Sequence, residues 1–366
     1  MERIYNFSSE QSTLPGEVVE LIKAEFENYA KCGIPVIELD RTSREYAEIA
    51  ASAEAALREL MNIPQNYRVL FMQGGADFQY SAIPLNLLSE HKCADYIVSG
   101  QHSKTASLEA KKYGDIAIAA SSAGASPAFS TVPDTKRSDF RPDADYVYIC
   151  FNNTVYGTKF HYIPDTGNIP LVADMSSFML SEPIDVSKFA LIYANAEIAV
   201  GAGSLTVVIV RDDLVSGAGK DTPAALNYKL VGEGSSVKST ASATSLYIAK
   251  LVFEWIISIG GLEEMKRRNE RKASRIYDYL DSQLYYTAPV DKKCRSMMNV
   301  VFVTGDASLD AKFAREAEQE GLFNLAGHGS VGGMCAAIYN AMTVEGVEKL
   351  VAFMKKFAQE NPKIEA

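Results

Sequence analysis

The sequence predicts an α/β protein with two domains: a large domain with a mostly parallel central sheet, and a smaller C-terminal α/β domain. Three observations lead to this prediction. Strand-like and helix-like segments alternate through most of the chain. Several strand-like segments are almost wholly apolar, which is typical of strands buried on both faces of a parallel sheet. The length of 366 residues also exceeds what one hydrophobic core usually organises.

In the first two thirds of the chain, apolar spacing predicts helices at 18–32 and 43–61. RVLFM at 68–72 predicts a short strand, which a Gly-Gly turn and a helix follow. YIVS at 96–99 predicts the next strand, and another helix is expected from Ser103. The remaining strands are expected at 115–119, 146–150, 170–174, 189–193 and 205–210.

Beyond about residue 240 the pattern changes. The expected elements are helices at 242–258 and 261–283, a strand around 297–303, a helix, a strand around 330–338, and a last helix at 344–360. The Gly260–Gly261 pair between the two long helices is a candidate hinge. We therefore expect a large domain at 16–259 and a small domain at 260–366. The segment 1–15 would pack with either domain.

Composition excludes several classes of function. The formal net charge of -10 disfavours nucleic acid and anionic membrane surfaces as partners. No apolar run approaches the length of a membrane span, and the opening MERIYNFSSE lacks the apolar core of a signal peptide. The five cysteines and four histidines are scattered without CxxC or HExxH spacing, so no disulfide framework and no metal site are expected. These features predict a cytoplasmic, metal-free protein.

Local patterns along nearly the whole chain resemble phosphoserine aminotransferase, a class V enzyme family that uses pyridoxal phosphate (PLP). Each pattern alone is weak, but together they occur in the family's order. They are NFSS at 6–9, QGGA at 73–76, ADYIVSG at 94–100, ADMSS at 173–177, PIDVSKFALIYA at 183–194, LTVVIVRDDL at 205–214, GGLEEM at 260–265, RSMMNV at 295–300 and GHGSVGGM at 327–334. The resemblance implies the fold type I architecture of PLP transferases and a homodimer.

The resemblance also implies a lysine that forms a Schiff base with the cofactor aldehyde. In the family that lysine lies in a stretch like AGAQKNLGPAGLT, but residues 194–206 here are ANAEIAVGAGSLT, so Ile198 takes its position. An isoleucine side chain has no nitrogen. We therefore expect no covalent PLP and no transaminase reaction. Glu197 replaces the glutamine that hydrogen-bonds the ring hydroxyl, and an ionised carboxylate can only accept.

Other residues that hold PLP in the family have changed. His102 replaces the tryptophan that stacks on the ring. Asp77 follows Ala76 at an expected helix N-terminus, where relatives cup the cofactor phosphate. A carboxylate there would repel the phosphate, although its simplest role is to favour the start of the helix. Ser239 replaces the asparagine that reaches the phosphate from the partner subunit.

Three residues of the family's cofactor site are kept. Asp174 matches the carboxylate that pairs with the pyridine nitrogen, and Thr154 matches the hydroxyl that touches the ring. Thr240 stands beside the changed partner-subunit contact. A carboxylate at a strand end can also persist because it caps the following turn. Non-covalent PLP is therefore an alternative, but not the expected state.

The arginines that grip the substrate in the family are missing. The family pattern HRSVGGMRAS becomes HGSVGGMCAA, so Gly329 and Cys335 replace two arginines while His328 is kept. Thr42 stands at the third arginine position, with Arg41 beside it. The Gly-Pro of the family's opening NFSxGP is Glu10-Gln11 here. We interpret Cys335, on an expected apolar strand, as a small buried hydrophobe rather than a nucleophile.

The leading hypothesis is a phosphoserine aminotransferase homologue that is inactive as a transaminase and acts as a binding, scaffold or regulatory protein. Its partners would be a second copy, an active paralogue or another protein, and its small-molecule ligand is unknown. The alternative is an enzyme with altered chemistry in the former cofactor pocket, with or without non-covalent PLP. Glu197, His102 or His328 would then act as new polar groups, although drift in an unused pocket explains Glu197 and His102 more simply.

Overall fold

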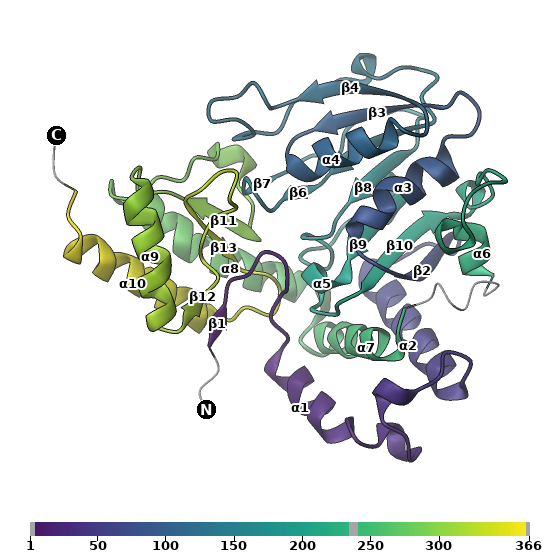
Figure 1. Cartoon of the computed structure of the whole chain (residues 1–366), viewed down its shortest axis with the longest axis horizontal. Coiled ribbons are helices and arrows are strands. Elements are labelled where there is room, and N and C mark those ends of the chain that lie inside the picture. The colour runs from purple at the N-terminus through teal and green to yellow at the C-terminus, as the bar shows by residue number, and fades with distance from the viewer. Residues whose placement is uncertain (1–3, 234–240, 364–366) are drawn as a thin grey trace.

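The computed structural model describes residues 4–233 and 241–363, and its elements alternate as the sequence predicts (Figure 1). The larger strands are β2 (Tyr67–Gln73), β3 (Cys93–Val98), β4 (Asp115–Ser121), β5 (Tyr146–Cys150), β8 (Leu171–Asp174), β9 (Leu191–Asn195), β10 (Leu205–Arg211), β11 (Asn299–Phe302) and β13 (Met334–Ala337). Two-residue strands are β1 (Tyr5–Asn6), β6 (Asn152–Asn153), β7 (Thr158–Lys159) and β12 (Leu322–Phe323). The helices are α1 (Gly16–Glu25), α2 (Arg44–Met61), α3 (Ala76–Leu87), α4 (Gln101–Ala110), α5 (Ala196–Ala199), α6 (Tyr228–Gly232), α7 (Ala243–Ser258), α8 (Gly261–Asp281), α9 (Ala307–Gln319) and α10 (Val344–Glu360).

Seven strands form the central sheet, in the order β2-β10-β9-β8-β5-β3-β4. The pairings among β3, β4, β5, β8 and β9 are parallel, whereas β10 runs antiparallel to both β2 and β9. The expected mostly parallel sheet is therefore confirmed. Because parallel strands end at the same edge, the residues that follow β3, β5, β8 and β9 gather at one edge of the sheet.

Helices cover both faces of this sheet (Figure 1). Val69 and Ile192 belong to one buried cluster, together with side chains of α2 and α7. Their chain neighbours Leu70 and Tyr193 belong to a second cluster, with side chains of α3 and α4. Successive strand residues point to opposite faces, so both faces of these strands are buried and the strands are apolar throughout.

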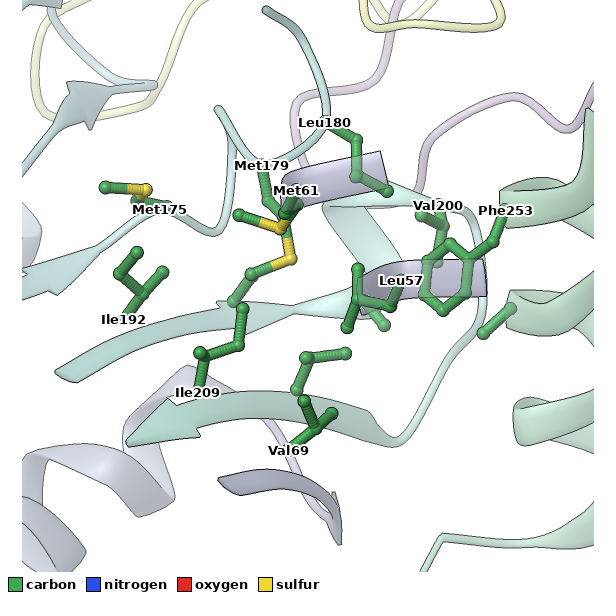
Figure 2. Close-up of a cluster of buried hydrophobic side chains, with 14 of the residues drawn as sticks. Leu57, Met61, Val69, Met175, Met179, Leu180, Ile192, Val200, Ile209 and Phe253 are labelled. Atoms are coloured by element: carbon green, nitrogen blue, oxygen red, sulfur yellow. The ribbon is translucent and has the colours of Figure 1, made fainter. Parts of the chain in front are cut away.

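The first of these clusters joins α2, α7 and the sheet. Figure 2 shows Leu57 of α2 beside Phe253 of α7, and Met61 above Ile209 of β10. Ser43 begins α2 as its N-cap, because its side chain accepts a hydrogen bond from the Tyr46 amide. The helix therefore starts just before Tyr46, the first of its residues that is buried in the core.

The C-terminal part packs α8, α9 and α10 against the antiparallel pair β11 and β13. The N-terminal strand β1 joins it by pairing in parallel with β12. Between α7 and α8 the chain turns by 86°, and Gly260 and Gly261 there have φ of 112° and 73°. Leu262 of α8 packs in the core beside α7, and Ile276 packs in the C-terminal core. One helix thus links both parts, and the exact domain limits stay a prediction.

Two expected elements were too long. The helix predicted at 18–32 ends at Glu25, because Asn28 is extended and Ala30 has a left-handed φ of 46°. The strand predicted around 330–338 is only Met334–Ala337, because Gly332 and Gly333 before it have φ of 74° and 69°. Among the described residues, no single helix is long and apolar enough to cross a membrane, and only the bent pair α7 and α8 passes that test together.

The core predicts a matched pair of mutants. Leu57→Ala removes a fully buried side chain and should lower the free energy of unfolding by about 2–5 kcal/mol. Leu284→Ala makes the same chemical change at a side chain that is 96% exposed, and should change it by less than about 0.5 kcal/mol. Urea unfolding followed by circular dichroism measures both. Equal effects would contradict the assigned core.

Candidate functional site

A cavity of about 330 Å³ lies at the edge of the central sheet where the parallel strands end, and the C-terminal part closes its other side. Cavities of this size commonly hold small molecules. Its polar lining residues come from the N-terminal segment, α4, the β6–β7 turn and the β12–β13 loop: Ser8, Ser9, Glu10, Gln101, His102, Thr154, Asn324 and His328. Its apolar lining residues are Val155, Ile198, Ala326 and Cys335. Five of the residues singled out from the sequence therefore meet in one place.

Ile198 lies on α5, the short helix that joins β9 to β10. Asn195 begins this helix by accepting a hydrogen bond from the Glu197 amide. The Ile198 side chain is partly buried and packs against a small cluster of Met298, Ala337 and Tyr339. An apolar side chain thus joins an apolar patch of the cavity wall.

His102 is held at both ring nitrogens. Its Nδ1 lies 3.3 Å from the Tyr80 hydroxyl, and its Nε2 lies 3.2 Å from the Thr154 hydroxyl. Burial raises the pKa of Tyr80, so that hydroxyl keeps its proton. The two hydroxyls fix the imidazole in the cavity wall and leave neither nitrogen free for another partner.

Asp174 is buried at the end of β8 and does not line the cavity. One carboxylate oxygen accepts from the amide and the hydroxyl of Ser176, at 2.9 and 2.6 Å. The other oxygen accepts from the Tyr193 hydroxyl at 2.9 Å, and the Tyr148 hydroxyl lies 2.8 Å from that of Tyr193. Protein groups therefore engage both oxygens.

Cys335 and His328 line the cavity without offering a nucleophile or a base. Burial raises the pKa of the Cys335 thiol to about 12, and the thiol donates to the Thr154 carbonyl at 3.7 Å. The Ser330 amide donates to Nδ1 of His328 at 3.2 Å, so the proton of the neutral imidazole lies on Nε2. His328 thus presents a donor.

Several residues singled out from the sequence lie elsewhere. Glu197 is not among the described residues that line the cavity, and His102 pairs with other groups, so the acid–base pair weighed above is not formed. Asp77 is exposed in the first turn of α3, which begins at Ala76 as predicted, and lines a separate surface hollow. Ser239 and Thr240 lie outside the described residues.

The three positions at which the resemblance implies substrate arginines are also dispersed. Gly329 is exposed, and a Cβ atom added to it would meet nothing within 4 Å. The Thr42 amide donates to Asp40 at 2.7 Å, and neither Thr42 nor Arg41 is among the described lining residues. Of these three positions, Thr42, Gly329 and Cys335, only Cys335 is among the described residues that line the cavity. Among the same residues, no group of three potential metal ligands occurs.

Sequence reasoning missed part of the lining: Ser8, Ser9, Gln101 and Asn324. The departure at Glu10 from the family's opening pattern was a signal, but the pattern does not show that Glu10 faces the same cavity as His102. These residues come from loops and helix ends whose paths are set by tertiary packing.

Comparisons with known proteins agree over almost the whole chain. The family model described as aminotransferase class-V matches residues 4–350. A phosphoserine aminotransferase of Bacillus cereus (strain ATCC 10987 / NRS 248) is 45% identical over 361 residues, covering 99% of this chain and 100% of that protein.

Two solved structures resemble this chain over nearly its whole length. One is a phosphoserine aminotransferase studied for radiation damage to its Schiff base, with a TM-score of 0.94 at 36% identity, covering 99% of this chain and 100% of that one. The other is the PLP-bound phosphoserine aminotransferase of Trichomonas vaginalis, with a TM-score of 0.89 at 35% identity, covering 96% and 100%. The fold type I architecture is thereby confirmed.

Proposed function

This chain belongs to the phosphoserine aminotransferases of class V, and we propose that it has lost transamination and acts as a small-molecule-binding or regulatory protein. One observation carries the proposal. Ile198, which the resemblance to the family puts at the position of the Schiff-base lysine, lies on α5 and in the wall of the cavity. The described residues that line this cavity include no lysine and no arginine.

Among the described residues, the two buried lysines, Lys159 and Lys272, are held by other groups. The Lys159 amine pairs with Glu182 at 2.8 Å. The Lys272 amine donates to the carbonyls of Ile338 and Tyr339, at 2.9 and 2.6 Å. Burial lowers the pKa of Lys272 to about 7, which would favour reaction with an aldehyde, but its side chain is shut inside the core. Neither lysine supports a replacement Schiff base.

The remaining residues do not fit PLP. Asp174 would have to pair with the pyridine nitrogen, yet it does not line the cavity, and Ser176 and Tyr193 already donate three hydrogen bonds to it. Asp77 places a negative charge in the first turn of α3, where the family binds the phosphate. Like charges about 4 Å apart repel by about 1 kcal/mol in water, and by more where water is excluded. These features support a cavity without the cofactor.

An absorbance titration with PLP tests the proposal. We expect no saturable change beyond the absorbance spectrum of free PLP, because the described residues that line the cavity include no lysine to form an imine. A family member that keeps the lysine serves as the positive control. A saturable band that matches the control would overturn the proposal.

Replacing one residue should not restore the enzyme. Ile198→Lys supplies an amine, but Gly329, Cys335 and Asp77 remain, so substrate and phosphate recognition stay absent. We expect phosphoserine aminotransferase activity at the level of the unmodified protein in a coupled assay with glutamate. Ile198→Leu controls for disturbed packing at α5. Measurable turnover by Ile198→Lys alone would show that the other substitutions matter less than we propose.

Altered chemistry in the same cavity is the second candidate. Its support is that the cavity is open and that eight polar residues line it. Against it, both nitrogens of His102 are engaged and His328 presents a donor. Glu10 is then the remaining candidate base among the described lining residues. Turnover of a bound molecule that disappears in Glu10→Gln would favour this candidate.

We also propose a homodimer, on the strength of the family resemblance. Phe78, in the first turn of α3, is 56% exposed and borders two surface hollows together with Pro223 and Leu226. An exposed apolar patch of this kind suits a subunit contact. Sedimentation equilibrium should give about twice the chain mass of 40.0 kDa. A monomer would contradict the proposal, and copurification with an active paralogue would favour a heteromer.

A further inference from the structure

The cavity differs in charge from a site for a doubly anionic substrate. Glu10 is the one formally charged side chain among the described residues that line it. Glu10 is exposed at the mouth, and no hydrogen bond or ion pair engages its carboxylate within the described chain. A concave surface with a free carboxylate and no cation attracts cations and repels anions.

The segment that carries Glu10 is fixed in place. The Glu10 amide donates to the Ser8 hydroxyl at 3.2 Å, and the Ser8 amide donates to the Asn6 side chain at 3.1 Å. The Tyr339 hydroxyl donates to the Ser9 carbonyl at 2.9 Å, and Tyr339 also packs against Ile198. The backbone that carries Glu10 is therefore tethered to the residue that packs against Ile198, which reduces the backbone entropy lost when a ligand binds.

Two other polar side chains of the cavity lining, Asn324 and His328, have defined hydrogen-bond directions. The Asn324 side-chain amide donates to Asn6 at 2.7 Å, so its carbonyl oxygen remains to accept. His328 presents its Nε2 proton, because Nδ1 accepts from the Ser330 amide. The cavity thus offers a carboxylate and a carbonyl that accept, and an imidazole that donates. A protonated amine matches the acceptors, and a hydroxyl oxygen matches the donor.

We propose that the cavity binds a small protonated amine that also carries hydroxyl groups, with its ammonium group at Glu10. This inference rests on the proposed function, since a Schiff base in the same cavity would occupy the space. The Asn324 side-chain carbonyl accepts a hydrogen bond from the ligand, and the His328 Nε2–H donates one to a hydroxyl oxygen. The apolar side chains of Ile198 and Val155 contact its carbon skeleton.

Three probes with the same three-carbon skeleton separate charge from shape: serinol is a cation, glycerol is neutral and glycerate is an anion. The chain has four histidines, so selective isotope labelling yields few NMR signals. His102 and His328 line the cavity, whereas His91 and His161 do not and serve as internal controls. Serinol should shift the first two signals saturably at neutral pH and leave the other two in place. Glycerol should bind more weakly, and glycerate should shift none.

Two matched variants assign the charge. Glu10→Gln should weaken serinol binding about fivefold, the usual size for one exposed ion pair, and leave glycerol unchanged. Glu318→Gln removes the same charge from an exposed site on α9 and should change neither. Thermal unfolding of each variant checks that the fold is kept.

Three outcomes of these experiments would overturn the inference. Tighter binding of glycerate would mean that a cation, such as one from a second subunit, enters the cavity. Equal serinol affinity in Glu10→Gln, or no shift with any probe, would remove the assigned ligand class. None of these results would bear on the loss of transamination. A borohydride-stable PLP adduct in this cavity would instead overturn the proposed function itself.

Discussion

The buried carboxylate of Asp174 is the constraint on which the site edge of the central sheet depends. It lies at the end of β8, where its charge must be matched inside the protein. Ser176 and Tyr193 supply three hydrogen bonds to it, and the Ser176 hydroxyl also accepts from the Asn195 amide at 3.0 Å. This network connects the ends of β8 and β9. Removing a partner from a buried charge typically costs about 3–5 kcal/mol.

This network shows that protein groups alone hold the site edge of the sheet together. Asp174 is satisfied by protein groups alone, so neither its charge nor the strand ends need a cofactor to be stable. The apolar side chain of Ile198 packs against Met298 and Tyr339. His102 closes a second set of hydrogen bonds with Tyr80 and Thr154. Both side chains thus find their contacts within the protein, and the chain keeps the fold of the family.

The sequence predicts the regular elements well, because their signals are local. α2 and α10 begin at the N-caps Ser43 and Thr343, directly before amphipathic runs. The early end of α1 depends on the left-handed backbone at Ala30, which no apolar spacing encodes.

In the site, too, the features encoded locally are predictable from the sequence, and those set by tertiary packing are not. The sequence predicts Ile198 at the position of the family's lysine, and the structure places this residue on α5, between β9 and β10. The roles of Glu10 and Asn324 could not be predicted, because loops from opposite ends of the chain bring them to one cavity. Asp174 lies at the end of a strand, as the sequence predicts, but the hydrogen bond that it accepts from Tyr193 depends on the register of β8 and β9.

The central claim is that the position of the lysine no longer binds PLP covalently. The most direct measurement is the intact mass of the protein after expression in cells supplied with pyridoxine and reduction with borohydride before purification. The account predicts the mass of the unmodified chain. A mass increased by one phosphopyridoxyl group, mapped by peptide analysis to a lysine at the cavity, would contradict it.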